Sequence, residues 1–262
     1  MQTVRKTVPK SQWLTSCHFH NLTENQVLAE VEARVKKTSR SLVLLDLDST
    51  LYEVGPRSHQ IIREWLLSPE SDPFPAVKAK LALLEAHHIG YSLRDTFRAI
   101  GLSMDVAEVN AAWESAKKFW AARFFTHEYL KYDHAYPGAA AFTQRLYDLG
   151  TYIVYLTGRD EPGMGDGTRA KLVADGFPWN VPRTTLLMKK HSSLPDLEHK
   201  LEAAHYIRDH GSLIASFENE PANLSALCHA FPDAMHVFIE TVSSDSEALV
   251  CQGLYRIKGF GT

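Results

Sequence analysis

The chain has 262 residues, a formal charge of −3 and an ordinary composition, with 45% hydrophobic and 23% charged residues. Its length allows one large domain or two smaller ones, and its composition is that of a globular protein rather than a disordered or fibrous one. The small net charge gives no electrostatic indication of nucleic-acid binding, and no apolar run approaches the ~20 residues of a membrane span.

The N-terminus and the cysteines indicate the cellular compartment in which we expect the protein. The stretch MQTVRKTVPKSQW is basic but has no apolar segment behind it, so we do not interpret it as a secretory signal. Cys17, Cys228 and Cys251 are widely spaced and form no metal-binding pattern, which is typical of free thiols in a reducing compartment. We therefore expect a cytoplasmic protein without a nucleic-acid or membrane partner, and we leave its oligomeric state open.

In chain order, the first clear element is an amphipathic helix at LTENQVLAEVEARVKK, with Thr23 as its N-cap. Five short apolar runs then predict strands at 41–46, 151–157, 185–189, 212–217 and 235–239. They are nearly continuous rather than alternating, as in parallel strands buried on both faces. Helical patterns lie at about 138–148, 167–175, 197–210 and 221–230. This alternation predicts a doubly wound α/β fold with a parallel sheet.

The segment between the first two strands is far longer than the dozen or so residues that a crossover needs. It carries several helical apolar stripes and ends at the turn YPG, 136–138. We therefore expect an α-helical cap subdomain at 54–135, inserted into a core formed by 1–53 and 136–262. The later stretch GRDEPGMGDGT lacks the lysine of a phosphate-binding P-loop, and we interpret it as a flexible loop.

Polar residues follow four of the predicted strands. In open α/β sheets ligands bind at the carboxyl ends of the strands, so these residues are expected to converge on one site. They are Asp46, Asp48, Ser49 and Thr50 after the first strand, Thr157, Gly158 and Arg159 after the second, Lys189 and Lys190 after the third, and Glu218, Asn219 and Glu220 after the fourth.

These residue types suit phosphoryl transfer. An ionised carboxylate can act as the nucleophile, and a second carboxyl group can protonate the leaving oxygen and then deprotonate water. Magnesium prefers hard oxygen ligands and takes a few carboxylates together with phosphate and water. A lysine offsets the negative charge of the phosphoryl group, while a threonine hydroxyl and glycine N–H groups can hold its oxygens.

In this order, DxDST, a strand ending in Thr-Gly, a lysine and an acidic cluster resemble the haloacid dehalogenase (HAD) superfamily over about residues 41–240. The resemblance implies that Asp46 is the nucleophile and a metal ligand. It also implies that Asp48 is the general acid/base and that the backbone carbonyl of Asp48 binds the metal. Thr157 and Lys189 are implied to bind the phosphoryl group. Glu218 matches the acidic ligand of Mg²⁺. The second aspartate favours phosphoryl chemistry over dehalogenation.

Several assignments stay open at this point. The acidic cluster usually offers aspartates, so either Glu218 or Glu220 can be the ligand, with Asn219 beside it. Lys190 is an alternative to Lys189, because side chains alternate along a strand. We expect substrate contacts from Ser49, Thr50, Gly158, Arg159 and Arg57, although each arginine can instead be solvated or salt-bridged.

The function expected from these residues is a magnesium-dependent phosphatase that acts on a small phosphorylated metabolite through an aspartyl-phosphate on Asp46. A phosphotransferase or phosphomutase would need the same nucleophile, and nothing in the sequence separates the two. Two further alternatives are a glycosyltransferase that uses Asp46 and Asp48 to hold a metal–nucleotide sugar, and an interaction protein with a relic site. The sequence does not name the substrate.

Overall fold

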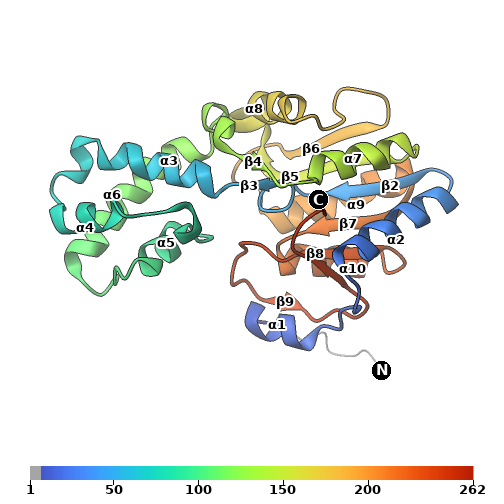
Figure 1. Ribbon diagram of the computed structural model, residues 1–262, viewed down its shortest axis with the longest axis horizontal. Helices are drawn as coiled ribbons and strands as arrows, with labels where there is room; N and C mark the ends of the chain where they lie inside the picture. Colours follow the sequence, from blue (N-terminus) through green and yellow to red (C-terminus); the bar gives the residue numbers. More distant parts are fainter. Residues whose placement is uncertain (1–6, 262) are drawn as a thin grey trace. The chain divides into compact units, whose positions relative to one another are not determined.

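The structure, a computed structural model, describes residues 7–261 (Figure 1). Contacts between residues divide the chain into two compact units. The first unit runs up to Tyr52 and includes Ala135–Pro162 and the residues from Leu172 onward, and the second comprises Glu53–His134 and Gly163–Lys171. The segment Gly163–Lys171, which falls in the expected core range, thus groups with the second unit.

The first unit is built on a parallel sheet of six strands in the order β10-β8-β7-β2-β5-β6, which confirms the predicted α/β fold. The strands are β2 (Ser41–Leu45), β5 (Tyr152–Asp160), β6 (Thr184–Lys189), β7 (Ser212–Glu218), β8 (Met235–Ile239) and β10 (Tyr255–Ile257). Every residue of β2 and β8 is buried, as expected for apolar runs in the middle of a covered sheet. The edge strand β10 was not predicted, because three residues are too short to show a pattern.

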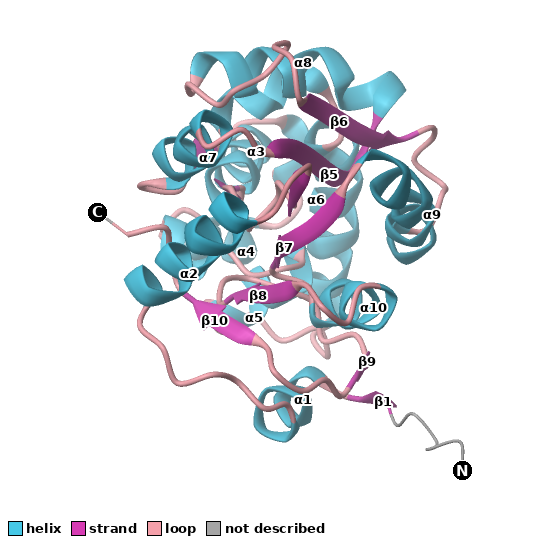
Figure 2. Ribbon diagram, turned by 90° about the vertical axis from the view of Figure 1, so that its right-hand side faces the viewer, coloured by secondary structure: helices cyan, strands magenta, loops and turns pink. Residues whose placement is uncertain are grey.

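Helices cover both faces of this sheet (Figure 2). On one face lie α2 (Glu24–Lys37) and α7 (Ala139–Asp148), and on the other α9 (Asp196–His210) and α10 (Pro221–Ala230). Alternate residues of β2 serve the two faces, and Leu42 and Leu44 pack in one apolar cluster with Ala203 and Ile207 of α9. Thr23 caps α2 as predicted, since its hydroxyl accepts the N–H of Gln26.

The second unit is helical. Its α-helices are α3 (Gly55–Leu66), α4 (Pro75–Leu81), α5 (Leu93–Ala99) and α6 (Ala107–Phe124), and its 3-10 turns are η1 (Pro69–Ser71), η2 (Ala86–His88) and η3 (His127–Tyr132). The apolar stripes of these helices meet in one core, in which Trp65, Phe97 and Trp113 are buried. Trp113 therefore packs in the core of this unit, as expected for a residue of a helical apolar stripe.

The remaining elements are short, apart from α8 (Glu161–Ala174). The pairs β1 (Thr7–Val8) with β9 (Ala248–Leu249), and β3 (Tyr52–Glu53) with β4 (His134–Ala135), each form a two-stranded sheet, and α1 (Lys10–Ser16) follows β1. Among residues 7–261, no helix is both long and apolar enough to cross a membrane.

The predicted loop at GRDEPGMGDGT is wrong, because its first three residues belong to β5 and α8 begins directly after them, with Gly163, Gly165 and Gly167 inside the helix. Glycine lowers helix propensity by roughly 1 kcal/mol, so the sequence favoured a loop. Packing explains one of the glycines. A Cβ at Gly167 would lie 2.6 Å from the carbonyl oxygen of His127, so only glycine allows this close approach.

Candidate active site

Asp46 lies directly after β2, at the carboxyl edge of the sheet. Its backbone N–H donates to the carbonyl oxygen of Phe217 on β7 at 3.1 Å, so the residue is fixed between two neighbouring strands. The chain then turns tightly, with Ser49 N–H bonded to the Tyr52 carbonyl at 2.7 Å and Ser49 at a φ of +61°. A left-handed φ is uncommon for a residue other than glycine and marks a turn held by its surroundings.

A lysine ammonium joins two carboxylates, that of Asp46 directly after β2 and that of Glu218 at the end of β7. Lys200 Nζ lies 2.6 Å from Asp46 Oδ1 and also contacts Glu218 Oε2. All three side chains are at most 6% exposed. The other oxygen of Glu218, Oε1, accepts the backbone N–H groups of Asn219 and Glu220 at 3.1 and 3.0 Å. Two carboxylates and one ammonium therefore form a buried, hydrogen-bonded cluster.

The electrostatics of this cluster follow from burial. The pKa of Asp46 is raised to about 7, because burial and the nearby Glu218 carboxylate together outweigh the opposing effect of Lys200. Burial also raises the pKa of Glu218. Burial by itself would lower the pKa of Lys200, but Asp46 and Glu218 outweigh it and the net shift is upward. Lys200 thus stays charged, and a further cation beside the two carboxyl groups would favour their ionised forms.

The lysine in contact with Asp46 is not the one that the sequence indicated. Lys189, at the end of β6, pairs with Asp196 at 2.9 Å, and Lys190 is exposed. Lys200 comes instead from the buried face of α9, where Ala203, Ala204 and Ile207 follow it at helical spacing. A lysine in line with an apolar stripe is the signal that could have identified it.

Asp48 lies beside Arg159. Nη2 and Nε of Arg159 are 2.5 and 3.1 Å from Asp48 Oδ1. The backbone N–H of Arg159 donates to Thr157 Oγ1 at 3.2 Å, and Thr157 is fully buried. Gly158, between these two residues, lies close to Asp196: a Cβ there would be 2.7 Å from Asp196 Oδ2 and would displace that carboxyl group. The structure therefore brings the polar ends of β2 and β5 together.

Three of the expected ligand-binding residues have structural partners. Thr50 is fully buried, and its hydroxyl donates to Asn219 Oδ1 at 3.2 Å. The amide nitrogen of Asn219 donates to the Val242 carbonyl at 2.7 Å, so the Asn219 side chain links the segment that carries Thr50 to the segment that carries Val242. Ser49 is buried, and its carbonyl accepts the hydroxyl of Thr241. These contacts give Ser49 and Thr50 structural roles in the turn after β2, and their expected contacts with a substrate stay a prediction.

Arg57 also has a structural partner, within the helical unit. Its guanidinium makes a two-pronged ion pair with Asp133, with Nε–Oδ1 at 2.7 Å and Nη2–Oδ2 at 2.5 Å. Both side chains are completely buried, and the guanidinium also lies over the ring of Phe124. The expected substrate contact is thus replaced by the salt-bridged alternative, because a fully buried arginine has no surface to offer a ligand.

The strand ends offer only part of a coordination shell for Mg²⁺. No group of three His, Cys, Asp or Glu side chains is placed to hold a metal ion in the described part of the chain. Asp46 and Glu218 nevertheless converge on one cationic atom, Lys200 Nζ, and both are hard oxygen donors. Mg²⁺ is commonly bound by one or two carboxylates, with water and phosphate oxygens completing its coordination. Glu218, rather than Glu220, joins Asp46, since Glu220 instead accepts from Ser244.

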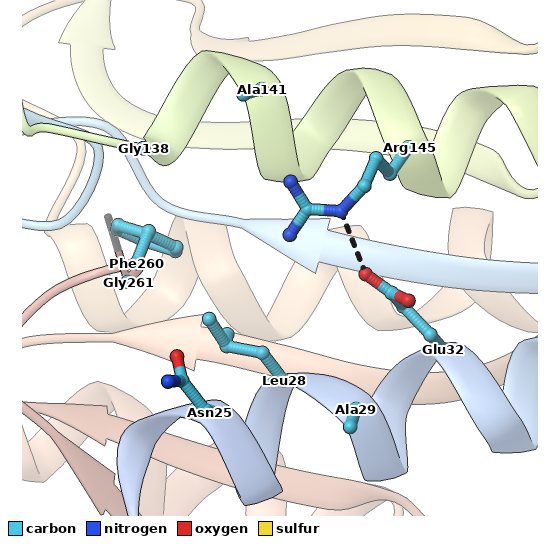
Figure 3. Close-up of a pocket in the computed structure, with 9 residues that line it drawn as sticks. All are labelled: Asn25, Leu28, Ala29, Glu32, Gly138, Ala141, Arg145, Phe260 and Gly261. Carbon is cyan, nitrogen blue, oxygen red and sulfur yellow. Dashed lines mark hydrogen bonds and ion pairs between the residues drawn. The ribbon is translucent and has the colours of Figure 1, made fainter.

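A separate pocket of about 370 Å³ lies between α2 and α7 (Figure 3). Its lining includes Leu28 and Phe260, and Arg145 Nε pairs across it with Glu32 Oε1 at 2.9 Å. None of the residues at the strand ends lines this pocket. We therefore do not associate it with the carboxylate cluster.

The sequence matches no protein-family model and no curated protein. Among solved structures, it is similar to a candidate phosphatase from Clostridium difficile, with 16% identity, a TM-score of 0.48 and coverage of 78% of this chain and 86% of that one. It is also similar to protein tyrosine kinase A of Mycobacterium tuberculosis, with 17% identity, a TM-score of 0.44 and coverage of 83% of this chain and 94% of that one.

A third similar structure is a predicted phosphatase from Clostridium acetobutylicum, with 15% identity and a TM-score of 0.44 over 81% of this chain and 93% of that one. Similarities at this level assign no activity. The function has to be inferred from the chemistry of the site itself.

Proposed function

We propose that this chain is a phosphatase of the HAD superfamily, which hydrolyses a small phosphorylated metabolite with the help of Mg²⁺ through an aspartyl-phosphate on Asp46. One observation carries the proposal: Lys200 holds the buried carboxylates of Asp46 and Glu218 together at the carboxyl edge of a parallel sheet. The motif order DxDST, Thr-Gly and an acidic cluster supports it. The small size of the substrate stays a prediction from the helical insertion.

The residues divide the reaction into two balanced steps. In the first, an oxygen of Asp46 attacks phosphorus, the bond to the ester oxygen breaks, and Asp48 gives that oxygen a proton. In the second, Asp48 takes a proton from water as the water oxygen attacks phosphorus, and the bond to Asp46 breaks. Lys200 and the Thr157 hydroxyl stabilise the charge on the phosphoryl oxygens. Bound Mg²⁺, held by Asp46, Glu218 and the Asp48 carbonyl, would neutralise part of that charge.

The glycosyltransferase alternative is not favoured by this geometry. It requires Asp46 and Asp48 to share one metal–nucleotide sugar, whereas each carboxylate here has a different cationic partner, Lys200 or Arg159. No observation separates hydrolysis from phosphoryl transfer to an alcohol, so the assay must do so.

The test is hydrolysis of para-nitrophenyl phosphate and of a panel of phosphometabolites by the wild type and Asp46→Asn, each with magnesium and with EDTA. We expect magnesium-dependent turnover that Asp46→Asn abolishes, while Asp209→Asn, a change at an exposed carboxylate of the same unit, retains it. An alcohol acceptor such as glycerol is then added. A larger amount of phosphorylated acceptor than of free phosphate would identify a phosphotransferase. If the folded wild type hydrolyses none of these esters, the result would support the alternative of an interaction protein with a relic site.

A further inference from the structure

Arg159 follows the phosphoryl-binding positions of β5 and is nearly inaccessible. Its side chain is 1% exposed, while that of Asp48 is 34% exposed. Two of its nitrogens, Nη2 and Nε, contact the same carboxylate oxygen of Asp48, Oδ1. A guanidinium so buried has little surface left for a substrate, but it can determine where a neighbouring carboxylate points.

The same residue fixes a second group of the site. Its backbone N–H donates to the Thr157 hydroxyl oxygen, so Thr157 and Asp48 are both oriented by Arg159. The guanidinium itself lies 5.6 Å from the centre of the Tyr52 ring, and Tyr52 forms a β-bridge with Asp48. Arg159 is therefore packed against the turn that carries the carboxylate it holds.

We propose that Arg159 is a positioning residue, which acts through Asp48 by aligning its carboxyl group for proton transfer with the ester oxygen and with water. This inference rests on the proposed function. It replaces the expected substrate contact of Arg159 with an indirect role. The physical reason is that a half-exposed aspartate has several rotamers, and proton transfer requires one of them.

The proposal makes the effect of Arg159 depend on the leaving group. An alkyl alcohol leaves phosphorus poorly without a proton, whereas nitrophenolate leaves readily without one. Misalignment of Asp48 should therefore slow alkyl esters more than aryl esters. A residue that held the substrate's phosphoryl group would affect both kinds of ester alike.

The experiment compares Arg159→Met, Arg159→Lys, Asp48→Asn and the double variant Arg159→Met/Asp48→Asn on para-nitrophenyl phosphate and glycerol phosphate. For Arg159→Met we expect kcat on the alkyl ester to fall by about 10²-fold, the lower range of general acid catalysis, with a much smaller loss on the aryl ester. KM should stay nearly constant, and lysine should recover part of kcat. In the Asp48→Asn background, Arg159→Met should have no further effect.

Arg145→Met is the matched control, because Arg145 pairs with Glu32 in the same unit away from the strand ends. Equal losses on both esters that add to those of Asp48→Asn would overturn the proposal, as would a rise in KM with kcat unchanged. If Arg159→Met fails to fold, Arg159→Lys and Arg159→Gln provide the same comparison of esters. Wild-type protein that hydrolyses neither ester with magnesium would instead refute the proposed function, and the role of Arg159 with it.

Discussion

Lys200 Nζ lies 2.6 Å from Asp46 Oδ1, although 154 positions separate the two residues in the sequence. The ammonium reaches the carboxylate from α9, a helix on one face of the sheet, whereas Asp46 belongs to the turn after β2. The pair brings the charge that a phosphoryl group needs to the same edge as the nucleophile.

Replacement of Lys200 should therefore damage both activity and stability. Lys200→Met leaves Asp46 and Glu218 without their buried counterion, so we expect the free energy of unfolding to fall by about 3–5 kcal/mol. We also expect kcat to fall by about 10²-fold or more, through loss of charge stabilisation. Urea unfolding and ester hydrolysis measure the two effects. Lys189→Met is the control, and a larger loss of kcat there than in Lys200→Met would return the catalytic role to Lys189.

The two glutamates of the acidic cluster should differ in their effect on magnesium. Glu218→Gln removes one of two carboxylates that converge on Lys200, so we expect the magnesium concentration for half-maximal activity to rise by about tenfold or more. A magnesium-dependent shift in melting temperature should shrink in parallel. Glu220→Gln should change neither property greatly, since Glu220 accepts hydrogen bonds from Ser244. The opposite ranking of the two variants would contradict this assignment.

In the helical unit, the Arg57–Asp133 pair should contribute to stability rather than to substrate binding. Arg57→Met removes the guanidinium that pairs with the fully buried Asp133 carboxylate and should lower the free energy of unfolding by about 3–5 kcal/mol. The double variant Arg57→Met/Asp133→Leu should recover part of this loss, because it buries no unpaired charge. Denaturant titrations check both values. A folded Arg57→Met variant with normal stability and a raised KM would instead support the substrate contact.

Stability should also depend on pH through His236. Burial lowers the pKa of this histidine, whose ring bonds to Ser216 Oγ and to the Phe231 carbonyl, each at 2.8 Å. Because the folded-state pKa lies below the unfolded value, the contribution is present above pH ~6.5 and is lost as the pH falls through that value, by at most about 1.4 kcal/mol per pH unit.

Urea unfolding at pH 7.5 and 5.5 measures this dependence. His236→Gln should reduce the loss of stability between the two pH values, and His191→Gln, at an exposed position, should leave it unchanged. Burial raises the pKa of Asp46, and this gives the stability an opposite dependence on pH. The test therefore compares the pH dependence of the wild type with that of the variant. An identical pH dependence in the wild type and His236→Gln would refute this prediction.

The sequence by itself determined the α/β alternation and the carboxylates at the strand ends. These features are local: apolar runs mark β2 and β5, Asp46 directly follows β2, and Glu218 is the last residue of β7. The expected insertion was also visible, because its length exceeds that of any crossover.

Only the tertiary structure decided which distant residues meet. The sequence analysis did not select Lys200, because this lysine lies within a helix and not at the end of a strand. Its contact with Asp46 depends on how α9 packs. Arg57 and Thr50 likewise found buried partners, Asp133 and Asn219, that no spacing in the sequence indicates. The reason is physical: a polar group inside a protein has to be paired, and the partner is chosen by the packing of whole elements rather than by neighbours along the chain.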